Sequence, residues 1–64
     1  MQNELNVLMS EMDAEFHNAK IESEKFGNGN NSAGTRLRKH MQNVKNLAQR
    51  VRVEVQDQKN AVTA

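Results

Sequence analysis

Apolar and small side chains recur in the first part of the chain with alternating spacings of four and three residues. The series is Leu5, Met9, Met12, Phe16, Ala19, Ser23 and Phe26. This alternation is typical of a coiled-coil seam, in which a helix buries one narrow stripe against a partner. The acidic residues fall largely off the stripe, so we expect an amphipathic helix over about residues 2–26. Leu8 widens the stripe at one end, whereas Val7 and Ile21 lie outside it and are available for a contact with another subunit.

The same alternation of threes and fours resumes in the second part of the chain. The series is Gly34, Leu37, Met41, Val44, Ala48, Val51, Val55, Gln58 and Val62, with Leu47 beside it. This pattern predicts a second helix over about residues 33–61, of about the same length as the first.

Residues 27–32 read Gly-Asn-Gly-Asn-Asn-Ser, a composition that interrupts helices and favours a tight turn. Gly27 is suited to the position just after the first helix, where positive φ is common. Asn30, Asn31 and Ser32 are all suited to cap the second helix by accepting hydrogen bonds from its free N–H groups.

A short turn between two long helices makes them antiparallel neighbours, so the predicted fold is all-α, a coiled-coil-like two-helix hairpin in one domain, 1–64. Gly34 costs about 1 kcal/mol of helix propensity relative to Ala, and we expect it to allow a close approach of its backbone to Phe26 or to a neighbouring chain. Because a lone hairpin leaves one side of its seam exposed, we also expect a homodimer, most simply a four-helix bundle.

Composition excludes several classes of function. The chain has no cysteine and only two histidines, His17 and His40, so disulfides, thiolate metal sites and a histidine-built zinc site are not expected. Its acidic first helix contains no Glu-x-x-His motif, and no nucleophile, base and orienting group occur together. We therefore expect no enzyme activity, no metal, no cofactor and no small-molecule substrate.

Membrane association is not expected either. The start of the chain lacks the basic residues and apolar run of a secretory signal, and no window approaches eighteen consecutive apolar residues. The second helix is basic and amphipathic, but with no Trp, and with Val and Ala dominating its apolar side, it would insert only feebly.

The net charge of +1 conceals a strong asymmetry between the two halves. Residues 1–26 carry six acidic residues and two lysines, a balance of −4, whereas residues 27–64 carry seven basic and two acidic residues, a balance of +5. Such a division indicates either two halves that lie against each other or a basic face for an anionic partner such as nucleic acid.

The basic residues of the second half form a regular pattern. Arg38, Lys45, Arg52 and Lys59 repeat every seven residues along one flank of the predicted helix, and Arg36, Lys39 and Arg50 flank the other side. One interpretation pairs them with the acidic first helix, for example Asp13 with Lys45. The other is a row of phosphate contacts along a duplex, which carries no base specificity. The sequence leaves both open.

The chain also resembles a known family, the bacterial linker-histone-like nucleoid proteins of the Hc type. The residues that carry the resemblance are Gly29–Lys39, Leu47–Arg50, Arg52, Glu54 and Lys59. The most distinctive part is Ala-Gly-Thr-Arg-x-Arg-Lys at the start of the second helix, whereas the first helix is similar only in character. The chain departs from the family pattern at Asn31, where members often carry Lys. It also ends at Ala64 without the Lys-rich tail of longer members.

The resemblance implies binding and compaction of DNA without sequence specificity. Arg36, Arg38 and Lys39 match basic positions of the family, and Arg50 and Arg52 follow them. The full set expected to contact DNA is Arg36, Arg38, Lys39, Lys45, Arg50, Arg52 and Lys59. We expect a cytoplasmic, nucleoid-associated protein, or one in the host cytoplasm if the source is a virus. The alternative is a structural interaction module whose acidic and basic flanks pair with each other, with no role on DNA.

Overall fold

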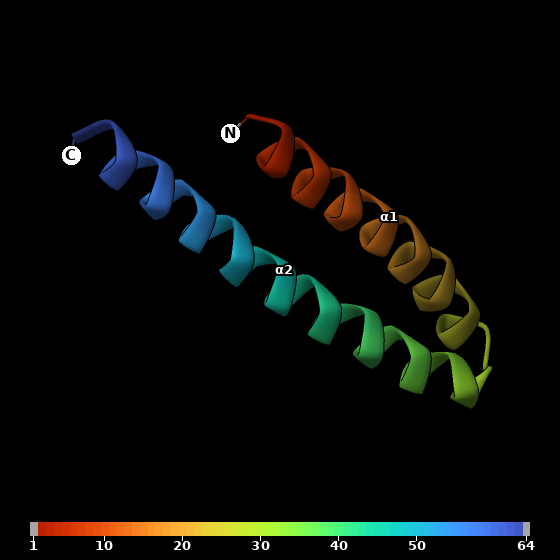
Figure 1. The fold of residues 1–64 in the computed structure, drawn as a ribbon. Helices are drawn as coiled ribbons and strands as arrows, with labels where there is room; N and C mark the ends of the chain where they lie inside the picture. Colours follow the sequence, from red (N-terminus) through yellow and green to blue (C-terminus); the bar gives the residue numbers. More distant parts are fainter. Residues whose placement is uncertain (1, 64) are drawn as a thin grey trace.

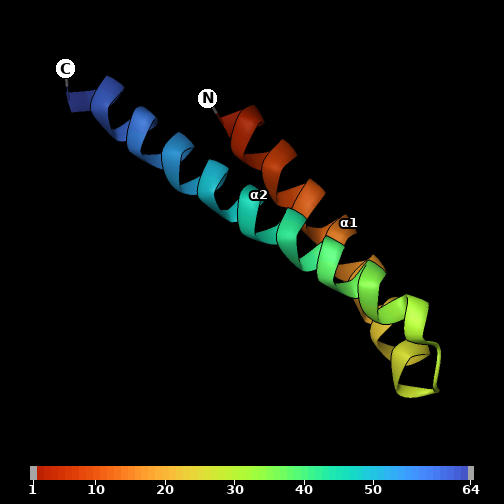
Figure 2. The ribbon, with the colours of Figure 1, turned by 90° about the horizontal axis from the view of Figure 1, so that it is seen from below.

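A computed structural model, which describes residues 2–63, shows two antiparallel α-helices, α1 (Gln2–Gly27) and α2 (Asn31–Thr63). The two chain ends lie at one end of the molecule and the turn at the other, and α2 extends beyond the start of α1 (Figure 1). The molecule is a rod with extents of 53 × 15 × 11 Å. Seen from below, α2 passes in front of α1 toward the turn, so the helices cross at a shallow angle (Figure 2). The predicted all-α hairpin is confirmed.

The turn is tighter than the sequence suggested, with only residues 28–30 between the helices. The N–H of Asn30 donates to the carbonyl oxygen of Lys25 at 3.0 Å, and the N–H of Gly29 donates to that of Phe26 at 3.0 Å. These two hydrogen bonds form a Schellman motif, in which the residue just after the end of the helix has positive φ. Gly29 takes that role with φ of 99°, whereas Gly27 remains in the helix, so the expectation for Gly27 was wrong by two residues.

The second helix begins immediately after its cap. Asn30 accepts a hydrogen bond at its Oδ1 from the N–H of Ala33 at 3.2 Å, and its backbone carbonyl also accepts from this N–H at 3.1 Å. Of the three residues that could cap α2, the structure selects Asn30, the residue next to Gly29.

The helices meet along a stripe that we call the contact seam. Its members in α1 are Leu5, Leu8, Met12, Glu15, Ala19 and Glu22, and in α2 they are Ala33, Leu37, His40, Val44, Leu47, Val51 and Glu54. The spacing is again three and four, but the stripe is rotated from the one predicted. Met9, Phe16 and Ser23 of the predicted seam are exposed, and so are Met41 and Val55, while the side chain of Val62 lies outside the described residues.

The rotation has a physical cause, since the contact seam contains polar side chains that find partners across the hairpin. Glu15 accepts a hydrogen bond from the side-chain amide of Asn43 at 3.1 Å, and its other oxygen lies 2.7 Å from Nδ1 of His40. A prediction from the apolar pattern places Glu15 and His40 outside the seam, because polar residues normally lie at the surface. Once partnered, they can be enclosed between helices.

Gly34 lies where the helices converge at the turn, as expected. A Cβ atom built on Gly34 would lie 2.7 Å from Cδ1 and from Cε1 of the Phe26 ring, closer than real Cβ contacts occur. The absence of a side chain at Gly34 therefore lets the Phe26 ring lie directly on the backbone of α2, which confirms this part of the prediction.

Candidate nucleic-acid interface

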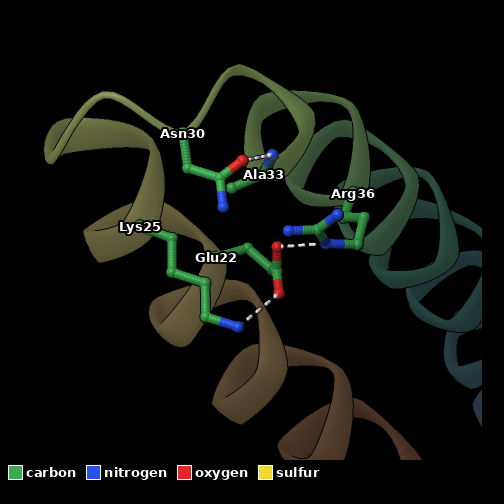
Figure 3. Close-up of polar contacts among 5 residues, drawn as sticks. All are labelled: Glu22, Lys25, Asn30, Ala33 and Arg36. Carbon is green, nitrogen blue, oxygen red and sulfur yellow. Dashed lines mark hydrogen bonds and ion pairs between the residues drawn. The ribbon is translucent and has the colours of Figure 1, made fainter.

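The first turns of α2 hold one arginine in a tight ion pair. Nε of Arg36 lies 2.6 Å from Oε2 of Glu22, and Nζ of Lys25 lies 3.8 Å from the other carboxylate oxygen of Glu22 (Figure 3). Glu22 is only 8% exposed. Because a carboxylate so enclosed needs a counter-charge, Arg36 serves to hold the two helices together near the turn.

A second arginine faces the same acidic flank of α1. Arg50 lies 3.9 Å from a carboxylate oxygen of Glu11 and 4.0 Å from one of Glu4. All three side chains are about half exposed, so each contact is weak. Arg36 and Arg50, two of the seven basic residues of the second half, thus lie beside acidic partners.

The other flank of α2 carries a row of cations that we call the basic row, made of Arg38, Lys45, Arg52 and Lys59. Arg38, Lys45 and Arg52 are exposed and form no ion pair with any part of the chain from residue 2 to residue 63. The pairing of Asp13 with Lys45 is likewise not formed in the described hairpin. Lys39 is exposed on the outer side of α2, three residues after Arg36 and therefore nearer to that flank than to the basic row.

Helix geometry makes the basic row straight and regular. Seven residues advance a helix by about 10.5 Å over almost two whole turns, so successive cations point the same way. From Arg38 to Lys59 the row covers about 31 Å, close to one turn of a B-DNA duplex. An anion lying along α2 on this side would meet positive charge at each step.

The structure therefore divides the cations that the sequence assigned to DNA binding. Arg36 and Arg50 lie on the flank that faces the acids of α1, whereas Arg38, Lys45 and Arg52 lie on the opposite flank. The sequence contains a signal for this division, because residues separated by whole seven-residue repeats lie on the same flank of a helix. Arg36 and Arg50 are two repeats apart, and so are Arg38 and Arg52. Which repeat faces α1 becomes apparent only once the contact seam is known.

Other kinds of site find no support in the part of the chain that the structure describes. Within residues 2–63, no three histidine, aspartate or glutamate side chains are grouped so as to hold a metal ion. Neither helix, over those same residues, has an apolar stretch of the length a bilayer crossing requires.

Comparison with known proteins gives one match. The family model described as histone H1-like protein Hc1 matches residues 6–61, which takes in both helices and the turn. No curated protein and no solved structure matches the chain.

Proposed function

Because the chain belongs to the histone H1-like protein Hc1 family, we propose that it is a DNA-associated architectural protein that binds the phosphate backbone without sequence specificity. The binding surface proposed is the basic row of α2, together with Lys39 on the outer side of the same helix. The proposed place of action is the bacterial nucleoid, where the protein would bind chromosomal DNA.

The observation that carries this proposal is the absence of acidic partners at three members of the basic row, Arg38, Lys45 and Arg52. A cation already paired with a carboxylate gains less from a phosphate, because it must first give up the pair. Arg38, Lys45 and Arg52 have no such pair within residues 2–63 and are exposed to solvent. When these cations bind phosphates, condensed counterions are released from the duplex, which is the main source of affinity in non-specific binding.

The geometry also accounts for the lack of sequence specificity. Base readout needs side chains of fixed geometry that enter a groove, and Asn, Gln and Arg are the usual readers. The basic row lies on the flank of α2 opposite the one whose arginines pair with the acids of α1. Cations spaced about 10.5 Å apart can follow phosphates, and phosphate contacts are the same for every sequence.

Two variants of equal charge test the proposal. Arg38→Gln with Arg52→Gln removes two cations from the basic row, and Arg36→Gln with Arg50→Gln removes two from the paired flank of the same helix. Fluorescence anisotropy with a labelled duplex of random sequence at about 0.1 M salt should show a 10- to 50-fold loss for the first variant, because each phosphate contact contributes up to about eightfold there. The second variant should bind like the parent protein within about threefold.

The second candidate is the interaction module without a role on DNA, which the ion pairs of Arg36 and Arg50 favour. Absence of binding at low salt by the folded parent protein would select this candidate. An equal loss in both variants would show that net charge, and not the basic row, determines binding.

A further inference from the structure

We propose that the DNA-binding surface of α2 is a stripe in which cations alternate with neutral amides, and that the amides themselves contact the phosphate backbone. This inference rests on the proposed function and extends the surface beyond the basic row. The stripe, which we call the cation–amide stripe, consists of Arg38, Gln42, Lys45, Gln49, Arg52 and Gln56.

The spacing of the cation–amide stripe places its members on one outward face of α2. Successive members are alternately four and three residues apart, the same alternation as in the contact seam. Gln49 comes two residues after Leu47 and two before Val51, which both belong to the contact seam. Two residues are a little more than half a helical turn, so Gln49 points away from α1. All six members of the stripe are exposed.

The amides of the stripe do not hold the hairpin together. Gln49 forms no hydrogen bond with any residue from 2 to 63. Gln42 donates to Oδ1 of Asn46 at 3.5 Å, and Gln56 donates to Oδ1 of Asn60 at 3.2 Å, both within α2 and exposed. Each of these bonds uses one N–H of the amide nitrogen and leaves the second for another acceptor.

Carboxylates are excluded from the cation–amide stripe. The chain has no acidic residue between Glu24 and Glu54. Glu and Gln have nearly the same helix propensity, so helix formation does not explain why Gln recurs in the stripe. On α1, by contrast, the outward position that corresponds to Arg38, five residues after a member of the contact seam, is occupied by Asp13. Because a carboxylate would repel a phosphate, its exclusion from this face of α2 indicates an anionic ligand there.

The amides are placed to reach phosphates that the cations leave unbound. Cations of the basic row lie about 10.5 Å apart along α2, whereas each strand of a duplex has a phosphate for about every 3.4 Å of its axis. Gln42 lies about 6 Å along the helix after Arg38 and about 4.5 Å before Lys45, and Gln49 lies in the same way between Lys45 and Arg52. Gln side chains are among the usual donors to phosphate oxygens. Since they carry no charge, they add affinity without releasing counterions.

Two matched pairs of substitutions test the inference. Gln42→Ala with Gln49→Ala removes two amides of the stripe, and Asn3→Ala with Asn18→Ala removes two exposed amides of α1. Ala has the highest helix propensity, so both variants should keep their helices, as circular dichroism can verify. Binding to a labelled duplex of random sequence is then measured by fluorescence anisotropy over a range of salt concentrations.

The pair on α2 should bind about 4- to 25-fold more weakly than the parent protein, or about two- to fivefold for each lost hydrogen bond. The slope of log K against log salt concentration should remain that of the parent, because no cation is removed. The pair on α1 should leave both affinity and slope unchanged. Gln42→Glu with Gln49→Glu keeps the size of the side chains and adds negative charge, so at low salt it should weaken binding more than the alanine pair on α2.

The outcomes separate this inference from the proposed function. A parent protein that does not bind DNA would refute the proposed function itself. If the parent binds DNA and the alanine pair on α2 binds as tightly, only the cation–amide stripe is refuted. A glutamate pair that binds no more weakly than the alanine pair would also refute the stripe. Loss of affinity with a shallower slope in the alanine pair would show that the amides act through the cations, which contradicts direct contact with phosphates.

Discussion

Replacing Arg36 by glutamine should destabilise the hairpin, whereas replacing Arg38 by glutamine should not, although both are exposed arginines of α2 separated by one residue. Arg36 carries the charge that faces Glu22, with 2.6 Å between Nε and the carboxylate oxygen. Arg38 forms no ion pair within residues 2–63. The contrast tests whether α2 has one flank for stability and another for binding.

The expected magnitude follows from the burial of the two partners. A hydrogen bond to a charged group contributes about 1.5–3 kcal/mol, and removing one partner of a fully buried pair costs about 3–5 kcal/mol. The Glu22 side chain is 11% exposed but that of Arg36 is 46% exposed, and Lys25 remains at 3.8 Å. We therefore expect a loss of about 1–2 kcal/mol for Arg36→Gln, which lowers Tm by about 4–16 °C in a domain of this size. For Arg38→Gln we expect less than about 0.5 kcal/mol.

The assay is thermal unfolding followed by circular dichroism, with every variant at the same protein concentration because self-association also raises Tm. Glu22→Gln combined with Arg36→Gln completes a double-mutant cycle. The double variant should recover part of the loss, since no enclosed charge is then left without its partner. Equal Tm values for Arg36→Gln and Arg38→Gln would refute the reasoning.

Three further predictions concern the turn and the contact seam. Asn30→Ala should lower stability by about 1 kcal/mol through loss of the cap, and Asn30→Asp should not, as measured by chemical denaturation. Gly34→Val should displace the ring of Phe26 and destabilise the hairpin, and Phe26→Ala in the same chain should relieve part of the loss; strictly additive effects in a double-mutant cycle would contradict the close approach. Glu15→Leu alone should destabilise because it leaves His40 without its partner, whereas Glu15→Leu with His40→Leu should be at least as stable as the parent in thermal unfolding.

Much of the fold could be predicted from the sequence because its signals are local. The alternation of threes and fours, the run of Gly and Asn at residues 27–32 and the small Gly34 beside Phe26 each act within a few residues or across one turn. The contact seam could not be predicted in the same way. The partners of Glu15 and Glu22 across the hairpin are His40, Asn43 and Arg36, which lie 14 to 28 residues away in the chain.

The candidate site shows the same limit. The seven-residue repeat of Arg38, Lys45 and Arg52 is visible in the sequence, but its lack of acidic partners is a property of the assembled hairpin. The suggested pairing of Asp13 with Lys45 was reasonable for two helices that face each other along the predicted seam. Rotation of the helices to bury Glu15 and Glu22 moves that pair to the outside, where the structure shows no contact between them.

The salt dependence of binding to two duplexes of unrelated sequence tests the central claim most directly. If Arg38, Lys45 and Arg52 each neutralise one phosphate, log K should fall linearly with log salt concentration with a slope of about −3 for each hairpin on the duplex. The same slope and affinity should be found with both duplexes, and Arg38→Gln with Arg52→Gln should reduce the slope by about 2. A slope near zero, a clear preference for one duplex, or an unchanged slope in that variant would contradict the account.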